Sequence, residues 1–133
     1  MPPDPVLVTV AVLRDLLPSA VTAGTVVPPD LTAKLPFVHV AAVRGRIVSP
    51  SWRGGPVVES ATVALSCWAG PDAGHARALA REVLSALLPV RSVAVDGGTV
   101  VAVLHVSSPV HVPDPFAPAD CHRYVTTVAV TVH

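Results

Sequence analysis

The chain has 133 residues, of which 51% are hydrophobic and 14% are charged, so it is long enough for one domain with a core that needs no disulfide or metal. Nine Lys and Arg residues balance nine Asp and Glu residues. A zero net charge argues against a dedicated nucleic-acid binder, and it gives no support to an acidic substrate or a membrane surface as partner. The apolar excess has two explanations, an abundance of small Ala and Val, or surface that another subunit covers.

The chain is expected to be soluble and cytoplasmic. Its apolar runs are much shorter than the about 20 residues that a membrane-spanning helix needs. Asp4 stands where a signal peptide would carry Lys or Arg, and Arg14 follows a very short apolar run. Cys67 and Cys121 are expected to be reduced and buried, as is usual in that compartment.

The first predicted element is a helix that begins after Asp4. Aspartate is a good N-cap residue, and Pro5 fits the first helical position because no backbone N–H is needed there. The apolar residues that share one helical face are Val6, Val10, Leu13 and Leu17. Pro18 ends this helix, and residues 18–34, which contain Gly24 and Pro28-Pro29-Asp30, predict a connecting loop.

Two strands are predicted next. The first covers residues 35–43 and is entered through Pro36, and the second covers residues 57–68. Residues 44–56 contain several Gly and Pro residues and predict a loop between them. Alternation along the second strand predicts that its core face consists of Ala61, Val63, Leu65 and Cys67.

The clearest helix of the chain follows Asp72, its predicted N-cap, and ends at Pro89. Its apolar stripe at helical spacing consists of Ala76, Leu79, Ala80, Val83 and Leu87. Residues 90–95 and 99–106 then flank Asp96-Gly97-Gly98, which predicts a tight hairpin turn. Residues 107–120 contain four prolines and predict a loop, and residues 122–132 predict the last strand.

These elements predict an α+β fold. We expect a single antiparallel β-sheet of about four strands with two helices packed on one face, in the order α-β-β-α-β-β with an optional further strand. No repeat or low-complexity linker divides the chain. Residues 1–133 are therefore expected to form a single domain.

The spacing of the potential metal ligands argues against a metal site. His105, His111, Cys121 and His122 are the residues to consider. Adjacent strand residues point to opposite faces, so Cys121 and His122 are poorly placed to share one ion, and no Cys-x-x-Cys or His-x-x-x-His spacing is present. We expect no metal and no cofactor.

A catalytic cysteine is the other chemical reading. Cys67 as a nucleophile needs a lowered pKa and a nearby base, which His39 or His105 on a neighbouring strand would supply. Its place on an apolar strand face favours a small buried hydrophobe instead. We therefore expect a protein that is not an enzyme.

Six residues are candidates for a protein interface, and one of them, Phe116, lies in the Pro-rich loop 107–120. Arg44, Arg46, Trp52 and Arg53 lie in the predicted loop 44–56, and Arg and Trp are residue types that anchor interfaces. The alternatives are a solvated hairpin loop with its tryptophan folded back on the sheet, or non-specific contact of the arginines with DNA phosphates. Trp68 falls on the strand face opposite the core set, where it either contacts a partner or packs at the edge of the helix layer.

Element order and several short segments together resemble the tail terminator proteins of long-tailed, siphovirus-type bacteriophages, in particular those of actinobacteriophages. The resemblance covers about residues 4–132. The segments that carry it are Leu35-Pro36-Phe37-Val38, Ser66-Cys67-Trp68-Ala69, the helix 76–88 and Arg123-Tyr124-Val125-Thr126-Thr127-Val128.

The resemblance implies a structural protein of the virion neck, found in the host cytoplasm during assembly. Copies of the chain would form a ring, expected to be hexameric, that caps the tail tube, ends its polymerisation and joins it to the head connector. The implied partners are the chain itself, the tail tube protein and the head–tail connector protein. DNA would only pass through the lumen, and no membrane is involved. The loop 44–56 and the Pro-rich loop with Phe116 would be contact segments.

Two other functions stay open. The nearer one is another neck component, such as a tail completion or head–tail joining protein, because such proteins are also small α+β subunits of rings. The more distant one is a small ligand-binding or enzyme domain built around His39, Cys67 and His105.

Overall fold

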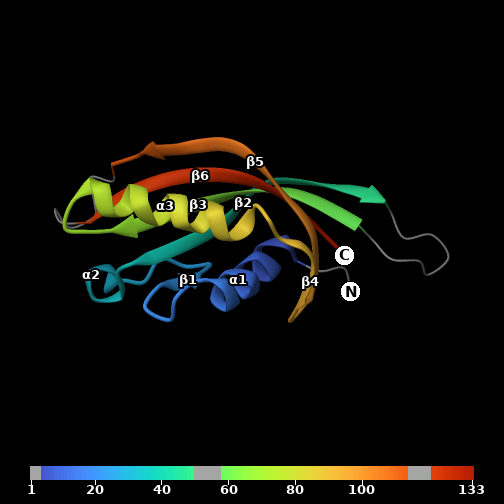
Figure 1. Ribbon diagram of the computed structural model, residues 1–133, viewed down its shortest axis with the longest axis horizontal. Coiled ribbons are helices and arrows are strands. Elements are labelled where there is room, and N and C mark those ends of the chain that lie inside the picture. The colour runs from blue at the N-terminus through green and yellow to red at the C-terminus, as the bar shows by residue number, and fades with distance from the viewer. Residues whose placement is uncertain (1–3, 50–57, 114–120) are drawn as a thin grey trace.

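The computed structural model describes residues 4–49, 58–113 and 121–133. Three helices and six strands are formed by these residues (Figure 1). In chain order they are α1 (Pro5–Leu16), β1 (Thr22–Gly24), α2 (Leu31–Lys34), β2 (Phe37–Ser49), β3 (Val58–Ala69), α3 (Ala73–Leu87), β4 (Arg91–Val95), β5 (Gly98–His111) and β6 (His122–Val132).

The strands form one sheet in the order β1-β2-β3-β6-β5-β4. Neighbouring strands are antiparallel, except that β1 runs parallel to β2. The predicted α+β class is confirmed, but the prediction of about four strands, all antiparallel, is wrong. The sequence analysis missed β1 because three residues inside a Gly- and Pro-rich connection are too short to show alternation.

The two longer helices lie on the same face of the sheet, as predicted (Figure 1). Helix α3 begins at its predicted N-cap, Asp72, and buries its whole predicted stripe. Helix α1 begins after Asp4, whose carboxylate accepts a hydrogen bond from the Val6 N–H at 2.9 Å. Within the described residues, no helix combines the length and the hydropathy that crossing a membrane requires.

The buried face of α1 differs from the predicted one. Val8 and Val12 are buried together with Val10 and Leu13, whereas Val6 is half-buried. The segment is apolar nearly all round, so its spacing fits more than one face, and packing against the sheet decides between them.

The core lies between these two helices and the sheet. Strand β3 supplies the four alternating residues predicted for its core face, and all four are buried. Leu65 and Val63 are fully buried, and Val128 and Val130 on β6 and Val38 and Val40 on β2 pack with them. The opposite face of the sheet carries no long helix among the described residues.

Three predicted loops contain regular structure. Strand β2 continues to Ser49, so residues 44–49 are paired with β3 instead of forming a loop. Strand β5 continues to His111 although Pro109 lies within it. Residues 18–34 contain β1 and the single-turn helix α2. In each case backbone pairing with a neighbouring strand, or packing, outweighs the local Gly and Pro signal.

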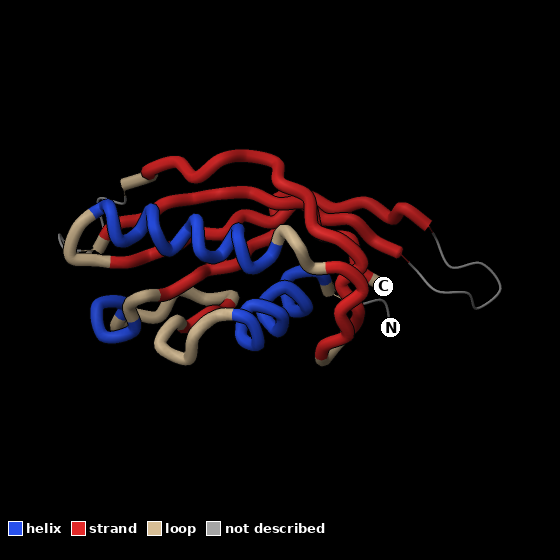
Figure 2. The backbone as a smooth tube through the Cα atoms, viewed as in Figure 1, coloured by secondary structure: helices blue, strands red, loops and turns tan. Residues whose placement is uncertain are grey.

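The hairpin from β4 to β5 turns where the Asp96-Gly97-Gly98 motif predicts it. Gly97 has a φ of +91°, a conformation that other residues rarely adopt. The sheet curls at this end, so that β4 and the beginning of β5 bend toward α1 (Figure 2). The curl separates the start of β5 from the flatter part of the sheet formed by β2, β3 and β6.

Candidate functional site

The predicted interface residues do not come together as one described surface. Arg44 and Arg46 belong to β2, opposite Thr62 and Ser60 of β3, and their side chains are not among those described. Trp52, Arg53 and Phe116 lie outside the described residues. The proposal that these side chains contact a partner therefore stays a prediction.

Trp68 is buried within its own chain. Its side chain is 3% exposed and packs with Leu31, Phe37 and Cys121 in a small cluster. The guanidinium of Arg123 lies 5.1 Å from the centre of its ring, a cation–π geometry. Trp68 is therefore covered by residues of its own chain, and its cluster is separate from the main core beneath the two longer helices.

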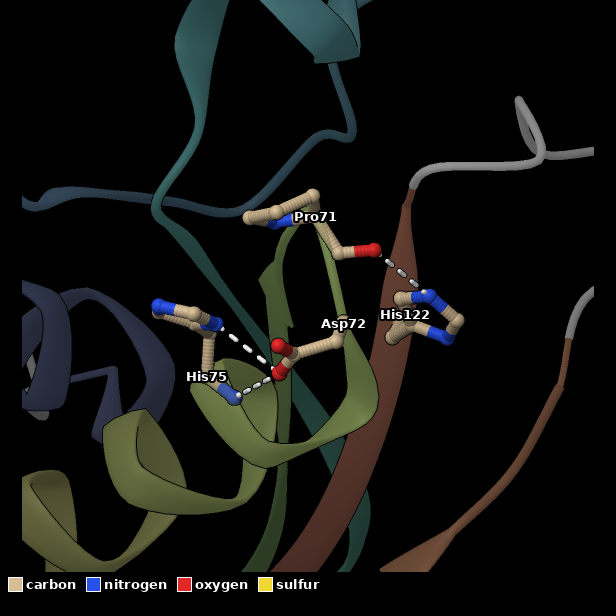
Figure 3. A network of polar contacts seen from close by, with 4 residues as sticks. All are labelled: Pro71, Asp72, His75 and His122. Carbon is tan, nitrogen blue, oxygen red and sulfur yellow. Dashed lines mark hydrogen bonds and ion pairs between the residues drawn. The ribbon is translucent and has the colours of Figure 1, made fainter.

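The polar residues before α3 form a helix cap (Figure 3). One carboxylate oxygen of Asp72 accepts hydrogen bonds from the backbone N–H of His75 at 3.1 Å and from its ring Nδ1 at 2.8 Å. These bonds from His75 hold the pKa of Asp72 below its ordinary value. His122 contacts the Pro71 carbonyl oxygen instead, at 3.1 Å. Both Asp72 and His75 are mostly exposed, so the pair serves to begin the helix.

The residues considered for a catalytic cysteine lie apart. Cys67 pairs with Val38 across the β2–β3 ladder, so His39 points to the opposite face of the sheet. The ring Nε2 of His39 contacts the Thr25 carbonyl oxygen, and that of His105 contacts the Ser107 carbonyl oxygen. Burial raises the pKa of Cys67 to about 12, the reverse of what a nucleophile needs.

Other ligand-binding features are weak. Among residues 4–49, 58–113 and 121–133, no three His, Cys, Asp or Glu side chains are grouped to hold a metal ion. An open groove of about 840 Å³ lies between α1 and the β4–β5 turn. Its lining mixes exposed Leu7 with Arg14, Asp15 and Asp96. Arg14 has a structural role, since its guanidinium donates a hydrogen bond to the Ala23 carbonyl oxygen at 3.1 Å.

The feature that sequence reasoning missed is a pair of open strand edges. Strand β4 pairs with β5 only from Gly98 to Ala102, so β5 from Val103 to His111 has β6 on one side and no described strand on the other. In the same way β1 covers β2 only from Phe37 to His39, and residues 40–49 pair with β3 alone among the described strands. Figure 1 shows β5 along one margin of the sheet.

Both open edges carry exposed apolar side chains. Leu104 is 63% exposed and Val110 57% on β5, and Val43 is 60% exposed on β2. From Val103 to His111 the chain contains no Lys, Arg, Asp or Glu. An open edge with exposed apolar residues and no charge is a template for pairing with another chain. The sequence signal was present in residues 103–106, but the loop predicted for residues 107–120 concealed how far the edge extends.

The part of the uncovered sheet face formed by Ser60–Ser66 of β3 and Val125–Thr131 of β6 is uncharged as well. On β3 its side chains are those of Ser60, Thr62, Ala64 and Ser66, and on β6 those of Val125, Thr127, Ala129 and Thr131. All of them are partly exposed. Small uncharged side chains on a broad sheet surface are easily desolvated, so this face is suited to contact with protein.

No family model and no curated protein sequence matches the chain. Among solved structures, the chain is similar to a component of the virion of a native gene transfer agent particle, with a TM-score of 0.55 and 20% sequence identity. The likeness covers 92% of this chain and 84% of that one. At this identity it establishes a shared fold over nearly the whole chain.

Proposed function

We propose that this chain is a structural assembly protein of a phage-type virion, and that its copies form a hexameric ring at the end of the tail tube. The ring ends tube polymerisation and joins the tail to the head connector. The chain acts in the virion neck and is assembled in the host cytoplasm. It needs no cofactor, and it performs no chemical reaction.

The observation that carries this proposal is the presence of two open edges on one sheet, each with exposed apolar side chains. A subunit whose two edges differ can bind its neighbour head to tail, and such contacts close into a ring when the rotation between subunits fits. The zero net charge favours such association over mutual repulsion.

Two similarities to virion proteins support the proposed location of the ring at the tail end. The fold is shared with a component of a gene transfer agent virion. The segments Ser66-Cys67-Trp68-Ala69 and Arg123-Tyr124-Val125 resemble those of tail terminators and lie on the central strands β3 and β6, which pair with each other. The stoichiometry of six and the contact with the tube come from the tail-terminator resemblance.

The proposal is tested by native mass spectrometry and negative-stain imaging of the purified chain, together with a tube-length assay. We expect a six-subunit ring. Added to polymerising tail tube protein of the same virion, the chain should stop elongation and leave tubes with one blunt, capped end. Tubes that grow to the same length distribution with and without the chain would contradict the capping function.

A charge variant connects this assay to the open edges. Leu104→Lys combined with Val110→Lys places two cations on the β5 edge, a change that blunts edge pairing. We expect this variant to fold and to lose the ring. Leu7→Lys, at a residue of α1 that is 57% exposed, is the matched control and should keep the ring. A closed ring with another number of subunits, or binding to the connector without capping of tubes, would instead favour another neck component.

A further inference from the structure

The two open edges of the sheet run in opposite directions. Strands β2, β3, β6 and β5 are successive neighbours, and each neighbouring pair is antiparallel. Four alternating strands leave the first and the last antiparallel to each other. A second copy that keeps the same strand directions can therefore place its β2 beside β5 of the first as an antiparallel neighbour, the more stable kind of pairing.

The two open edges are each covered by a short strand, at opposite ends of the sheet. Through the ladders of β3 and β6, Val103 of β5 lies level with Gly45 of β2, and His111 lies level with Val38. Strand β4 covers β5 at one end of the sheet, and β1 covers β2 at the other end. Two copies placed at the same level would have β4 and β1 between their edges.

A slide along the strands removes this obstruction. If the second copy moves by about four residues, or about 13 Å, its Ser49 lies opposite Leu104, and its free residues 42–49 lie along residues 104–111 of the first copy. Strand β4 of the first copy and β1 of the second then lie beyond the two ends of the paired region. Such a stagger between tilted neighbours is the offset by which sheets close on themselves.

We infer that the ring is closed by strand pairing, in which β5 from Leu104 to His111 of one copy pairs antiparallel with β2 from Ala42 to Ser49 of the next copy in this staggered register. The inference rests on the proposed ring and names its subunit interface. The sheet is then continuous around the ring, and Val110 lies opposite the neighbour's Val43.

A two-fold pairing of β5 with β5 is the competing arrangement. It would leave β2 from Val40 to Ser49 open on both copies, with exposed Val43 unused. Head-to-tail pairing uses both edges of every subunit. The β5 edge is moreover not a uniform ladder, since its register with β6 shifts around Ser107 and Pro109 lies within it. Such irregularities suppress indiscriminate pairing, including that of two β5 edges with each other.

Disulfide trapping tests the inference directly. The double variant Val43→Cys, Val110→Cys should form inter-subunit disulfides on mild oxidation, giving a ladder of covalent oligomers on non-reducing gels. Within one chain the two positions are three strand spacings apart, about 14 Å, beyond the reach of a disulfide. Each single variant should remain monomeric on the gel, and an equal mixture of the two should stop at the dimer.

Matched pairs report the register and the partner strand. Val43→Cys with Leu104→Cys would be linked if the copies lay level with each other, because Leu104 is level with Arg44. Val43→Cys with Val93→Cys would be linked if β4 were the docking strand. Both pairs should react much more slowly than the first pair, and the wild-type chain controls for Cys67 and Cys121.

Several outcomes would overturn the inference. Preferential linking of either matched pair would reject the staggered β5–β2 register, and a covalent dimer of Val110→Cys alone would indicate β5–β5 pairing. A closed ring by native mass spectrometry with no link in the double variant would reject the interface and leave the proposed function standing. Absence of both ring and link in solution would reject the interface, while the tube-length assay would still decide whether the chain caps tubes.

Discussion

Cys67 shows how burial sets the chemistry of a single residue in this fold. It lies on the inner face of β3, and burial raises the pKa of its thiol from 9.0 to about 12. At pH 8 the folded chain then holds about a thousand times less Cys67 thiolate than an exposed cysteine would. We expect Cys67 to react with a thiol reagent only as fast as the chain unfolds, and to react at once in denaturant.

The same pKa gives a stability dependence on pH. The folded-state pKa of Cys67 lies above the ordinary 9.0, so the unfolded chain ionises first as pH rises. The contribution of the protonated Cys67 thiol to the free energy of unfolding is therefore fully present below pH 9.0 and is lost as pH rises from 9.0 toward about 12. Urea unfolding of the wild type and of Cys67→Ala between pH 7 and 10.5 measures this, since only the wild type titrates at residue 67. Rapid native-state labelling of Cys67, assigned by comparison with Cys67→Ala, would contradict the prediction and revive the enzyme alternative.

At the scale of one element, the alternation along β3 separates core from surface. Val63 is fully buried among helix and sheet residues, whereas its neighbour Thr62 points to the uncovered face and is partly exposed. We expect Val63→Ala to lower the free energy of unfolding by about 2 kcal/mol, through lost apolar burial and a cavity. Thr62→Ala should change it by no more than about 0.5 kcal/mol. Urea denaturation of both variants as monomers measures the difference, and equal effects would mean that both faces of β3 are covered in the monomer.

The elements that the sequence predicted well are those with a strong internal pattern. The helix after Asp72 and the last strand, residues 122–132, have the predicted positions, because apolar spacing and a cap agree along their length. The helix after Asp4 also begins at its predicted cap, but its buried face could not be chosen because valines occur on every side.

The elements that it missed depend on partners distant in the sequence. Gly45 within β2 and Pro109 within β5 signal loops locally, yet their strands are held by β3 and β6. The candidate site was missed for the same reason. Whether an edge is open depends on where the short strands β1 and β4 stop and on how far β5 continues. The β4 hairpin was predicted, but β1 was missed and β5 was predicted to end at residue 106. Trp68 was chosen for its residue type, and it is covered by Leu31 and Phe37 from outside its own strand.

For the molecule as a whole, the distribution of charge separates two kinds of assembly. No Lys, Arg, Asp or Glu occurs in Val103–His111 of the β5 edge or in Ser60–Ser66 of β3, and the net charge of the chain is zero. A ring held by these surfaces depends on backbone hydrogen bonds and apolar contact. A ring held by Arg44, Arg46 and Arg53 would instead depend on ion pairs with an acidic partner surface.

The salt concentration distinguishes a ring held by apolar contacts from a ring held by ion pairs. The Debye length falls from about 10 Å at 0.1 M salt to about 3 Å at 1 M, so exposed ion pairs are screened while apolar contacts stay intact. We expect the fraction of chain in the ring, measured by sedimentation velocity at fixed protein concentration, to stay constant or to rise between about 0.1 M and 1 M NaCl. The triple variant Arg44→Gln, Arg46→Gln, Arg53→Gln should assemble as the wild type does. Dissociation of the wild-type ring at high salt, with loss of the ring in the arginine variant, would mean that the arginines, and not backbone pairing and apolar contact, hold the interface.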